Sequence, residues 1–497
     1  MPDNDSDATA DGGVAEYDVI VLGGGPAGEN AAAYAVAGSD RTAAIVEPEK
    51  VGGECSYWAC IPSKALLRPG HVLGAALGLP GIEAEGPDTA EVLRRRDEFV
   101  HAHNGDHDDS SQVEWAAQQG IEVIRGTGRL DGERRVRVGD RVLCARSAVV
   151  LATGTHAAVP DVPGLRAALP WTSRDATNLH EVPKRVIVIG GGVVACEATT
   201  WLSALGAEVT VLVRGDRLLA GVEPFAGEYV ASALTAQGVQ IRFGTRPLRV
   251  ARPAAVDHGE GRIHGGAVTV HAQGPDGETT FVADEIVVAA GRVPNTEGVG
   301  LETVGLPDGY VEVDDQLTVT GVPGEWLYAV GDINHRAALT HMGKYQGRVC
   351  GDVISARAAG RSLTGPRYRA AADHHAVPQV VFTDPEVAAV GLTAAAARKA
   401  GHEIRTVELD IAVAGSALAR DDYTGRAALV IDTATDTLLG ATFVGPDVGE
   451  QLHAATIAVA GRVPLDALWH AVPAFPAISE FWLRLLETDR SSLRSAV

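Results

Sequence analysis

Two cysteines five residues apart, Cys55 and Cys60, have the spacing in this chain that most clearly suggests redox chemistry. Two neighbouring thiols can form a disulfide and so exchange two electrons. On a regular helix, α-carbons five residues apart are roughly 8.6 Å from each other, whereas a disulfide needs about 4.4–6.8 Å. If the pair is bridged, we therefore expect Cys55 in an irregular turn that leads into a helix carrying Cys60. The amide groups at a helix start would stabilise a thiolate there.

The alternative is that Cys55 and Cys60 are two unpaired core cysteines, because cysteine outside disulfides is often buried. The glycines before the pair and the run Ile61–Lys64 after it favour the redox interpretation. The three other cysteines are scattered along the chain, so they predict packing residues rather than a secreted disulfide framework. They are Cys144, Cys196 and Cys350.

Composition and charge limit the class of protein. The 497 residues predict about three domains, and 46% hydrophobic and 21% charged residues are typical of a globular protein. The formal net charge of −22 argues against nucleic acid or an anionic membrane as a partner. No run of about 18 apolar residues occurs, so we expect no membrane span. The acidic, polar residues 1–15 predict a disordered tail rather than a signal peptide, and we expect a cytoplasmic protein.

A complete dinucleotide-binding pattern lies near the N-terminus. Residues 17–22 predict a buried parallel strand, residues 29–36 a helix and residues 42–46 a second strand that ends at Glu47. The turn between the first strand and the helix has the form G-x-G-x-x-G, in which glycines let the backbone approach a pyrophosphate. An acidic residue about 20 positions on accepts a hydrogen bond from a ribose hydroxyl. The three glycines are Gly23, Gly25 and Gly28.

The same pattern occurs a second time, which predicts two dinucleotide sites and hence two domains. A strand at 185–189, a turn at 190–195, a helix at 197–205 and a strand at 209–213 follow one another. Residues 160–170, rich in Pro, Gly and Ala, predict a linker between the two patterns.

Beyond the second pattern, the chain is expected to return to the first domain. Strands at 286–289 and 327–330 are each followed by a turn, and Asp332 stands at the carboxyl end of the latter, where open α/β sheets bind ligands. From about residue 371, short strands and helices alternate and predict an α+β domain without a nucleotide motif.

These residues together resemble the class I pyridine nucleotide–disulfide oxidoreductases, the family of lipoamide dehydrogenase, glutathione reductase and mercuric reductase. The resemblance covers nearly the whole chain, and the motifs occur in the family's order. The motifs are 23–28 with Glu47, 53–64, 152–154, 190–197, 291–295, 330–332 and 382–386.

The resemblance implies an α/β fold with two Rossmann-like dinucleotide-binding domains and a C-terminal α+β dimerisation domain. We expect a discontinuous FAD-binding domain at 16–158 and 290–368, an NAD(P)-binding domain at 159–289 and a dimerisation domain at 371–497. The family further implies a homodimer.

The resemblance also implies roles for individual residues. Cys60 would form the thiolate nearer the flavin, Cys55 would attack the outside acceptor, and Lys64 would pair with Glu197 beside the flavin. Asp332 would bind the ribityl chain of FAD. The further residues expected to bind the two cofactors are Gly23, Gly25, Gly28, Glu47, Gly53, Thr153, Gly154, Gly331, Gly190, Gly192, Arg214 and Gly291.

The end of the strand at 209–213, in the second dinucleotide pattern, predicts a preference for NADPH over NADH. Relatives that use NADH typically carry Glu where this chain has Val213, and relatives that use NADPH tend to carry Arg where Arg214 stands. An arginine can bind the 2′-phosphate of NADPH by charge-assisted contacts. Arg217 could add a second charge, and the alternative is that both are surface arginines.

The chain departs from the family pattern at its last motif. Most relatives carry a His-Pro segment whose His is the acid–base for the thiol; here Pro476 and Glu480 match, but the His position holds Phe475. Phenylalanine cannot carry a proton. We expect Glu480 near a helix N-terminus, and His470, five residues before Phe475, to be an ordinary surface or packing residue.

Three interpretations of Phe475 stay open. The enzyme reduces a disulfide with a proton from elsewhere, its thiolate attacks carbon or sulfur without protonation, or the protein is a flavin-bound redox sensor or scaffold. We expect an NAD(P)H-dependent flavoprotein disulfide reductase whose acceptor is a small disulfide, a quinone or a metal ion. The histidines His101, His103 and His107 lack regular ligand spacing, so no metal site is expected.

Overall fold

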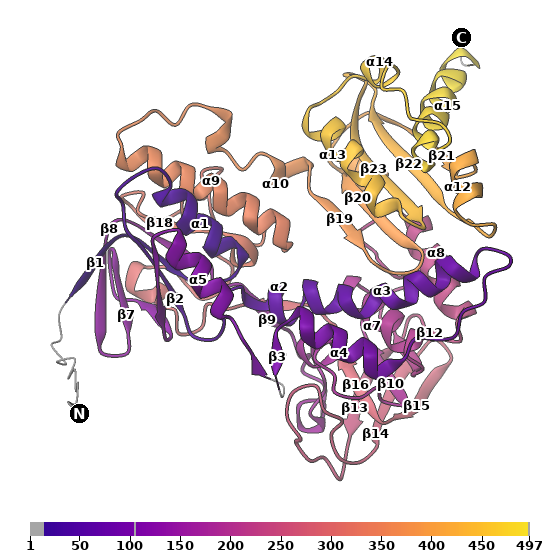
Figure 1. The fold of residues 1–497 in the computed structure, drawn as a ribbon, viewed down its shortest axis with the longest axis horizontal. Helices are drawn as coiled ribbons and strands as arrows, with labels where there is room; N and C mark the ends of the chain where they lie inside the picture. The colour runs from indigo at the N-terminus through magenta and orange to yellow at the C-terminus, as the bar shows by residue number, and fades with distance from the viewer. Residues whose placement is uncertain (1–13, 104–105, 496–497) are drawn as a thin grey trace, which may run out of the picture. The chain divides into compact units, whose positions relative to one another are not determined.

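The structure is a computed structural model that describes residues 14–103 and 106–495, and its ribbon is shown in Figure 1. It divides into two compact units. The first unit comprises the chain up to Cys55 together with residues 108–156 and 293–370. The second unit comprises residues 56–107, 157–292 and 371–497. Most of the tail expected at 1–15 lies outside the described residues, and the first strand already begins at Ala15.

The first unit is built on a sheet in the order β5-β2-β1-β8-β7-β6, with β18 also pairing with β8. The pairs β1–β2, β1–β8, β2–β5 and β8–β18 are parallel. β18 pairs with β8, so a strand from beyond the second dinucleotide pattern lies in the same sheet as β1. The strands are β1 (Ala15–Leu22), β2 (Ala43–Glu47), β5 (Ile121–Arg125), β6 (Gly128–Leu130), β7 (Arg135–Val138), β8 (Arg141–Leu151) and β18 (Leu327–Ala329).

Two helices of the first unit pack together through glycines at every fourth position. Figure 1 shows α1 (Pro26–Val36) and α9 (Thr340–Ala358) side by side. A Cβ on Gly347 would lie 2.5 Å from the Ala27 carbonyl oxygen, and one on Gly351 would lie 2.5 Å from the Tyr34 Cβ. The remaining helices of this unit are α5 (Ser110–Gln118), η2 (Leu301–Val304), η3 (Gly331–Asn334) and η4 (Pro366–Tyr368).

The second unit contains a parallel sheet in the order β12-β11-β10-β16 and an antiparallel sheet β13-β14-β15. The strands are β10 (Arg185–Ile189), β11 (Glu208–Leu212), β12 (Gln240–Arg242), β13 (Arg246–Ala251), β14 (Val268–Gly274), β15 (Gly277–Ala283) and β16 (Glu285–Val288). The helices are η1 (Arg166–Ala168), α6 (Ser173–Thr177), α7 (Val193–Ala204) and α8 (Pro224–Ala236).

Residues 56–107 belong by their contacts to the second unit, although we expected them within the FAD-binding domain. The predicted assignment of domains to cofactors therefore stays a prediction. The elements of this segment are α3 (Cys60–Leu77), α4 (Thr89–Phe99), β3 (Ala102–His103) and β4 (Asp106–His107). The short helix α2 (Gly53–Tyr57) lies at the boundary, as do the paired strands β9 (Thr155–Ala157) and β17 (Arg292–Pro294).

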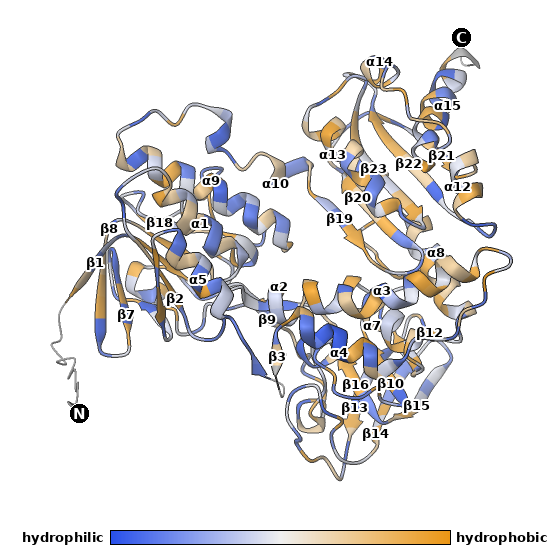
Figure 2. Cartoon of the chain, viewed as in Figure 1, coloured by the Kyte–Doolittle hydropathy of each residue, from blue (hydrophilic) through white to orange (hydrophobic). Residues whose placement is uncertain are grey.

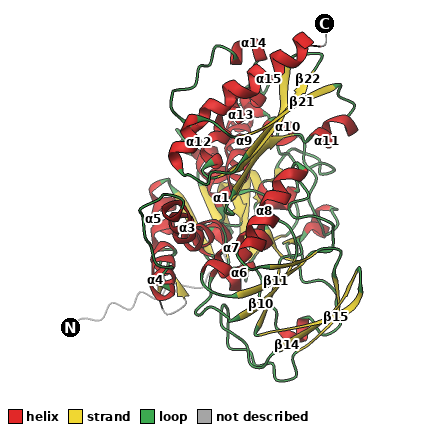
Figure 3. Ribbon diagram, turned by 90° about the vertical axis from the view of Figure 1, so that its right-hand side faces the viewer, coloured by secondary structure: helices red, strands yellow, loops and turns green. Residues whose placement is uncertain are grey.

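The C-terminal part of the second unit is an antiparallel sheet in the order β19-β20-β23-β22-β21 with helices, which confirms the predicted α+β character (Figure 3). Figure 2 shows hydrophobic residues along β20, β22 and β23, whose inward side chains form one core. The strands are β19 (Pro378–Val381), β20 (Glu386–Gly391), β21 (Ile404–Asp410), β22 (Arg426–Asp432) and β23 (Thr437–Gly445). The helices are α10 (Ala372–His375), α11 (Ala394–Lys399), α12 (Ala414–Ala419), η5 (Val448–Gln451), α13 (Leu452–Ala460), α14 (Leu465–Leu468), η6 (Ile478–Glu480) and α15 (Phe481–Ser495).

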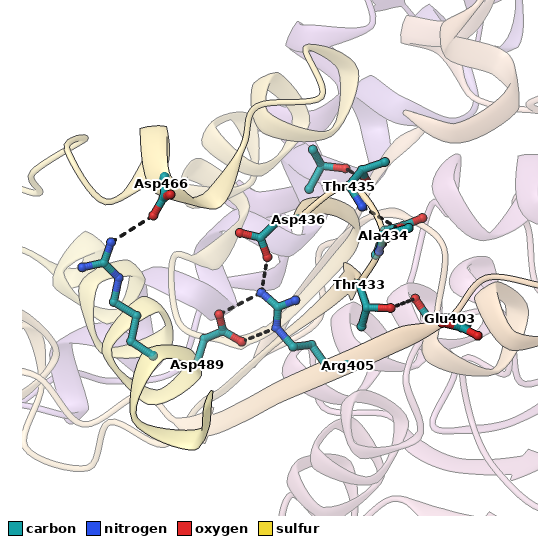
Figure 4. Close-up of polar contacts among 11 residues, drawn as sticks. Glu403, Arg405, Thr433, Ala434, Thr435, Asp436, Asp466 and Asp489 are labelled. Atoms are coloured by element: carbon teal, nitrogen blue, oxygen red, sulfur yellow. Dashed lines mark hydrogen bonds and ion pairs between the residues drawn. The ribbon is translucent and has the colours of Figure 1, made fainter. Parts of the chain in front are cut away.

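The last helix is fastened to this sheet by one arginine (Figure 4). Arg405 on β21 donates to both carboxylate oxygens of Asp489 on α15, at 2.7 and 3.0 Å, and also contacts Asp436. Asp489 is 4% exposed, so the ion pair satisfies a carboxylate that would otherwise be costly to bury.

The turn after β1 requires glycine for two different reasons. A Cβ on Gly28 would lie 2.1 Å from the carbonyl oxygen of Gly23, and Gly23 itself has φ +106°. A Cβ on Gly25, in contrast, would meet no protein atom nearer than 4.0 Å. The backbone packing thus requires glycine at 28 but leaves open space at 25.

We therefore expect Gly28→Ala and Gly25→Ala to lower the free energy of unfolding of the cofactor-free protein by different amounts. Gly28→Ala should lower the free energy of unfolding by about 2–4 kcal/mol, since the backbone must move to admit the methyl group. Gly25→Ala should cost under about 1 kcal/mol, the usual loss for alanine at a helix N-cap. Denaturant unfolding of the two variants measures the difference, and equal losses would contradict it.

Candidate functional site

The two cysteines lie on different helices. Cys60 is the first residue of α3, as predicted, whereas Cys55 lies within the five-residue helix α2. The expectation that Cys55 occupies an irregular turn is therefore wrong, because the irregular residues come after it. The break falls at Trp58 and Ala59, and Ala59 has φ −130° and ψ −95°. Both cysteines are partly exposed, and their redox pairing stays a prediction.

Helix α3 contains a proline and several glycines that determine how it packs against its neighbours. Pro69 lies inside it and lacks an N–H, and the side chain of Arg95 donates to the Ala65 carbonyl at 3.3 Å instead. Glycines at every fourth position allow neighbours to approach closely. A Cβ on Gly74 would lie 2.7 Å from an Asp384 oxygen, and one on Gly78 would lie 2.8 Å from the Arg420 guanidinium.

An ion pair joins α3 to the second dinucleotide pattern. The Lys64 ammonium lies 2.8 Å from Glu197 Oε2, and Glu197 Oε1 accepts the Phe382 N–H at 3.0 Å. Lys64 also lies 4.8 Å above the Phe382 ring. The Glu197 side chain is 6% exposed, so both its oxygens are matched in a buried setting. The structure thus brings together Lys64 and Glu197, two residues that the resemblance paired.

The first glycine turn forms a cradle at the carboxyl ends of β1 and β2. Glu47 Oε2 accepts the Gly24 N–H and Oε1 accepts the Glu49 N–H, each at 2.7 Å. Burial raises the pKa of Glu47. A Cβ on Gly53 would lie 2.8 Å from the Gly25 Cα, so the close approach of the two backbones requires glycine at 53, whereas the open space lies at 25. No side chain caps the N-terminus of α1, whose amides suit a pyrophosphate such as that of FAD.

A second group of predicted cofactor residues lies at the ends of β8 and β18. The Thr153 hydroxyl donates to the Asn295 carbonyl at 2.7 Å, and the Asn295 N–H donates to the Gly154 carbonyl at 3.0 Å. Asp332 accepts from the Thr155 hydroxyl at 2.8 Å.

Two supporting residues of this group escaped the sequence analysis. They are Thr155, the donor to Asp332, and Gln346, which accepts the Gly331 N–H at 2.8 Å and is fully buried. Neither belongs to a local motif, and only the folded sheet brings them to their partners.

The second glycine turn has the same construction. A Cβ on Gly190 would lie 2.3 Å from the Ala289 carbonyl oxygen, whereas one on Gly192 would meet no atom within 4 Å. Val213 is 3% exposed and packs under the turn, and Arg214 after it is exposed. The residues present fit a pyridine nucleotide, and position 213 offers it no carboxylate. Gly291 has φ +129° and a carbonyl that accepts the Ala158 N–H.

Glu480 has an unusual environment. It is 8% exposed; Oε1 accepts from Arg484 at 3.0 Å, and Oε2 has no hydrogen-bond partner among the described residues. Phe475 is 76% exposed. The expectation that Glu480 lies at a helix N-terminus agrees with its place directly before α15.

Two further expectations concern metals and membranes. Within residues 14–103 and 106–495, no three His, Cys, Asp or Glu side chains gather as a metal-binding group. None of the helices described there has the length and apolar character needed to cross a membrane.

Comparisons with known proteins agree with this geometry. Residues 17–347 match the family model of the pyridine nucleotide-disulphide oxidoreductases, and residues 377–485 match that family's dimerisation domain, which supports a homodimer. Dihydrolipoyl dehydrogenase 3 of Pseudomonas aeruginosa is 32% identical and covers 89% of this chain and 91% of its own. Mercuric reductase of Staphylococcus aureus is 29% identical, and the match covers 96% of this chain and 83% of the mercuric reductase.

A solved structure shares the fold. The HOCl-induced flavoprotein disulfide reductase RclA of Escherichia coli superimposes with a TM-score of 0.77 at 23% identity, over 95% of this chain and 99% of that chain. The match confirms two Rossmann-like domains and an α+β domain. The chain belongs to the pyridine nucleotide-disulphide oxidoreductases, flavoprotein enzymes that use FAD and a pyridine nucleotide.

Proposed function

We propose that the protein is an NADPH-dependent disulfide reductase that acts as a homodimer through the Cys55–Cys60 pair on a small acceptor, foremost a disulfide. The observation that carries this proposal is the ion pair, at 2.8 Å, between Lys64 and the buried carboxylate of Glu197. Lys64 follows Cys60 by one helical turn, so the ion pair and the thiol share a face of α3.

The net reaction is NADPH plus H⁺ plus a disulfide giving NADP⁺ and two thiols. The chemistry that FAD supplies when bound is the passage of two electrons from the reduced nicotinamide to the cysteine pair. The Cys60 thiolate would lie at a helix N-terminus, where amide dipoles stabilise its charge. Cys55 would attack the acceptor, forming a mixed disulfide that Cys60 resolves.

The domain roles belong to the same proposal. The residues around Gly25 and Asp332 would bind FAD, the segment 159–289 would bind NADPH, and 371–497 would form the dimer interface. The scattered cysteines suit a reducing compartment, and we place the enzyme in the cytoplasm.

The second candidate is a redox sensor, or an enzyme that needs no acid–base group, either one whose thiolate attacks carbon or a quinone reductase that uses the flavin directly. The observation in its favour is Phe475 together with the Arg484 contact of Glu480. The open second cradle at Gly192 favours the reductase over a scaffold, because a scaffold has no use for a nicotinamide site.

The first test is anaerobic titration with NADPH followed by thiol labelling and mass spectrometry. We expect labelling of both Cys55 and Cys60 to rise with one equivalent of NADPH, together with a long-wavelength band beyond the flavin's own absorption. Cys60→Ser should lose the band, and the control Cys144→Ser should keep it. Flavin bleaching with neither cysteine labelled would remove the pair from the electron path and favour quinone reduction.

Arg214→Glu tests the cofactor preference. We expect kcat/KM for NADPH relative to NADH to fall at least tenfold, because the variant replaces a charge-assisted contact to the 2′-phosphate by repulsion. Arg249→Glu makes the same change at an exposed arginine on β13 and should leave the ratio unaltered. An unchanged ratio in Arg214→Glu would assign specificity elsewhere.

Phe475→His tests whether proton transfer limits disulfide reduction. We expect turnover to rise about 100-fold, the lower end of the usual contribution of acid–base catalysis. The new imidazole has a usual pKa of about 6.5, and a neighbouring carboxylate would raise that pKa. An acid role would then be lost as pH rises through the raised pKa. Phe475→Leu is the control, and equal pH–rate profiles for both variants would contradict a proton-limited reaction.

A further inference from the structure

Two aromatic residues, Tyr57 and Trp58, stand between the two cysteines in the chain. Both side chains are buried, with exposures of 3% and 5%. Trp58 occupies the break between α2 and α3 and is followed by Ala59 and Cys60. The position of this residue therefore governs the path of the chain into Cys60.

Three residues contact Trp58 directly, and a fourth holds one of these three. Its indole N–H donates to Glu260 Oε1 at 2.8 Å, and its carbonyl oxygen accepts from the Thr177 hydroxyl at 2.8 Å. The Arg174 guanidinium lies 4.3 Å from the ring centroid. The Asn178 amide donates to the same Glu260 oxygen at 2.8 Å. Side chain and backbone of Trp58 are thus fixed together.

The residues that contact Trp58 are themselves held firmly. Thr172 and Asp175 form a capping box at the start of α6, which carries Arg174 and Thr177. The Gly261 N–H donates to Asp175 Oδ1 at 3.2 Å, and a Cβ on Gly261 would lie 2.1 Å from the Asn178 carbonyl oxygen. The loop bearing Glu260 therefore packs directly on α6 and presents a fixed acceptor.

We propose that Trp58 is a positioning residue that favours the Cys55–Cys60 disulfide over the dithiol. Closing a disulfide costs the conformational entropy of the residues inside its ring. The contacts with Glu260 and Thr177 order Trp58 in the dithiol as well, so less entropy is lost when the bond forms. The inference rests on the redox-active pair of the proposed function.

The test is equilibration of the purified FAD-loaded protein with oxidised and reduced dithiothreitol. Dithiothreitol reduces the Cys55–Cys60 bond to two thiols and becomes a cyclic disulfide, and alkylation with mass spectrometry gives the fraction reduced. We expect Trp58→Phe, which keeps a ring for Arg174 but loses the indole N–H, to be reduced at least tenfold more readily, a rise of about 30 mV in potential.

Matched variants separate this effect from loss of structure. Glu260→Ala should shift the equilibrium as Trp58→Phe does, whereas Glu260→Gln keeps an acceptor oxygen and should restore it. Trp469→Phe, at a tryptophan that lies under Arg490 with 3.8 Å between guanidinium and ring, should leave the equilibrium unchanged. If Trp58→Phe fails to fold, the comparison of the two Glu260 variants decides.

The outcomes distinguish the inference from the proposed function. Equal equilibria in wild type, Trp58→Phe and Glu260→Ala would overturn the positioning role, whatever NADPH does. A second outcome is that the variants shift the dithiothreitol equilibrium as expected, but NADPH does not reduce the cysteine pair. That outcome would support the positioning role and refute the proposed electron path. A wild-type pair that never forms a disulfide would refute both.

Discussion

The buried carboxylate of Glu197 is the constraint on which the proposed hydride site depends. A buried carboxylate must be fully matched, and Glu197 is matched by Lys64 from α3 and by the Phe382 amide that follows β19. Three stretches of chain far apart in sequence are thereby held to one side chain. Moving any of them would leave the buried carboxylate without a partner. The ion pair therefore fixes the position of the helix that begins at Cys60, in addition to its electrostatic role.

Glycines give the helices the close approach that this arrangement needs. Gly74 and Gly78 let α3 approach Asp384 and Arg420, and Gly347 and Gly351 let α9 approach α1. At Gly78 a side chain would overlap the Arg420–Asp422 ion pair, and at Gly347 it would overlap the backbone of α1. The same residue type also opens the two turns at positions 25 and 192, where no protein atom fills the space. Glycine thus serves packing at some positions and a ligand cradle at others.

Local patterns in the sequence were sufficient for the two dinucleotide units. The strand expected at 185–189 is β10 to the residue, since parallel strands buried on both faces are continuous apolar runs. Cys55 was misplaced because the helix breaks after it rather than before it. The Trp58–Glu260 contact joins residues that are 202 positions apart, so no local sequence pattern predicts it.

The contact between Glu480 and Arg484 bears on how the enzyme handles protons. Arg484 lies one turn along α15 and donates to Oε1 of Glu480 at 3.0 Å. Because Arg405 fastens α15 through Asp489, the arrangement is part of the folded domain and not an adaptable surface contact. Phenylalanine at 475 cannot carry a proton, and one oxygen of the carboxylate at 480 already accepts from Arg484. For the proposed reductase, a disulfide whose departing thiol has a low pKa, and so leaves without a proton, would be a suitable acceptor.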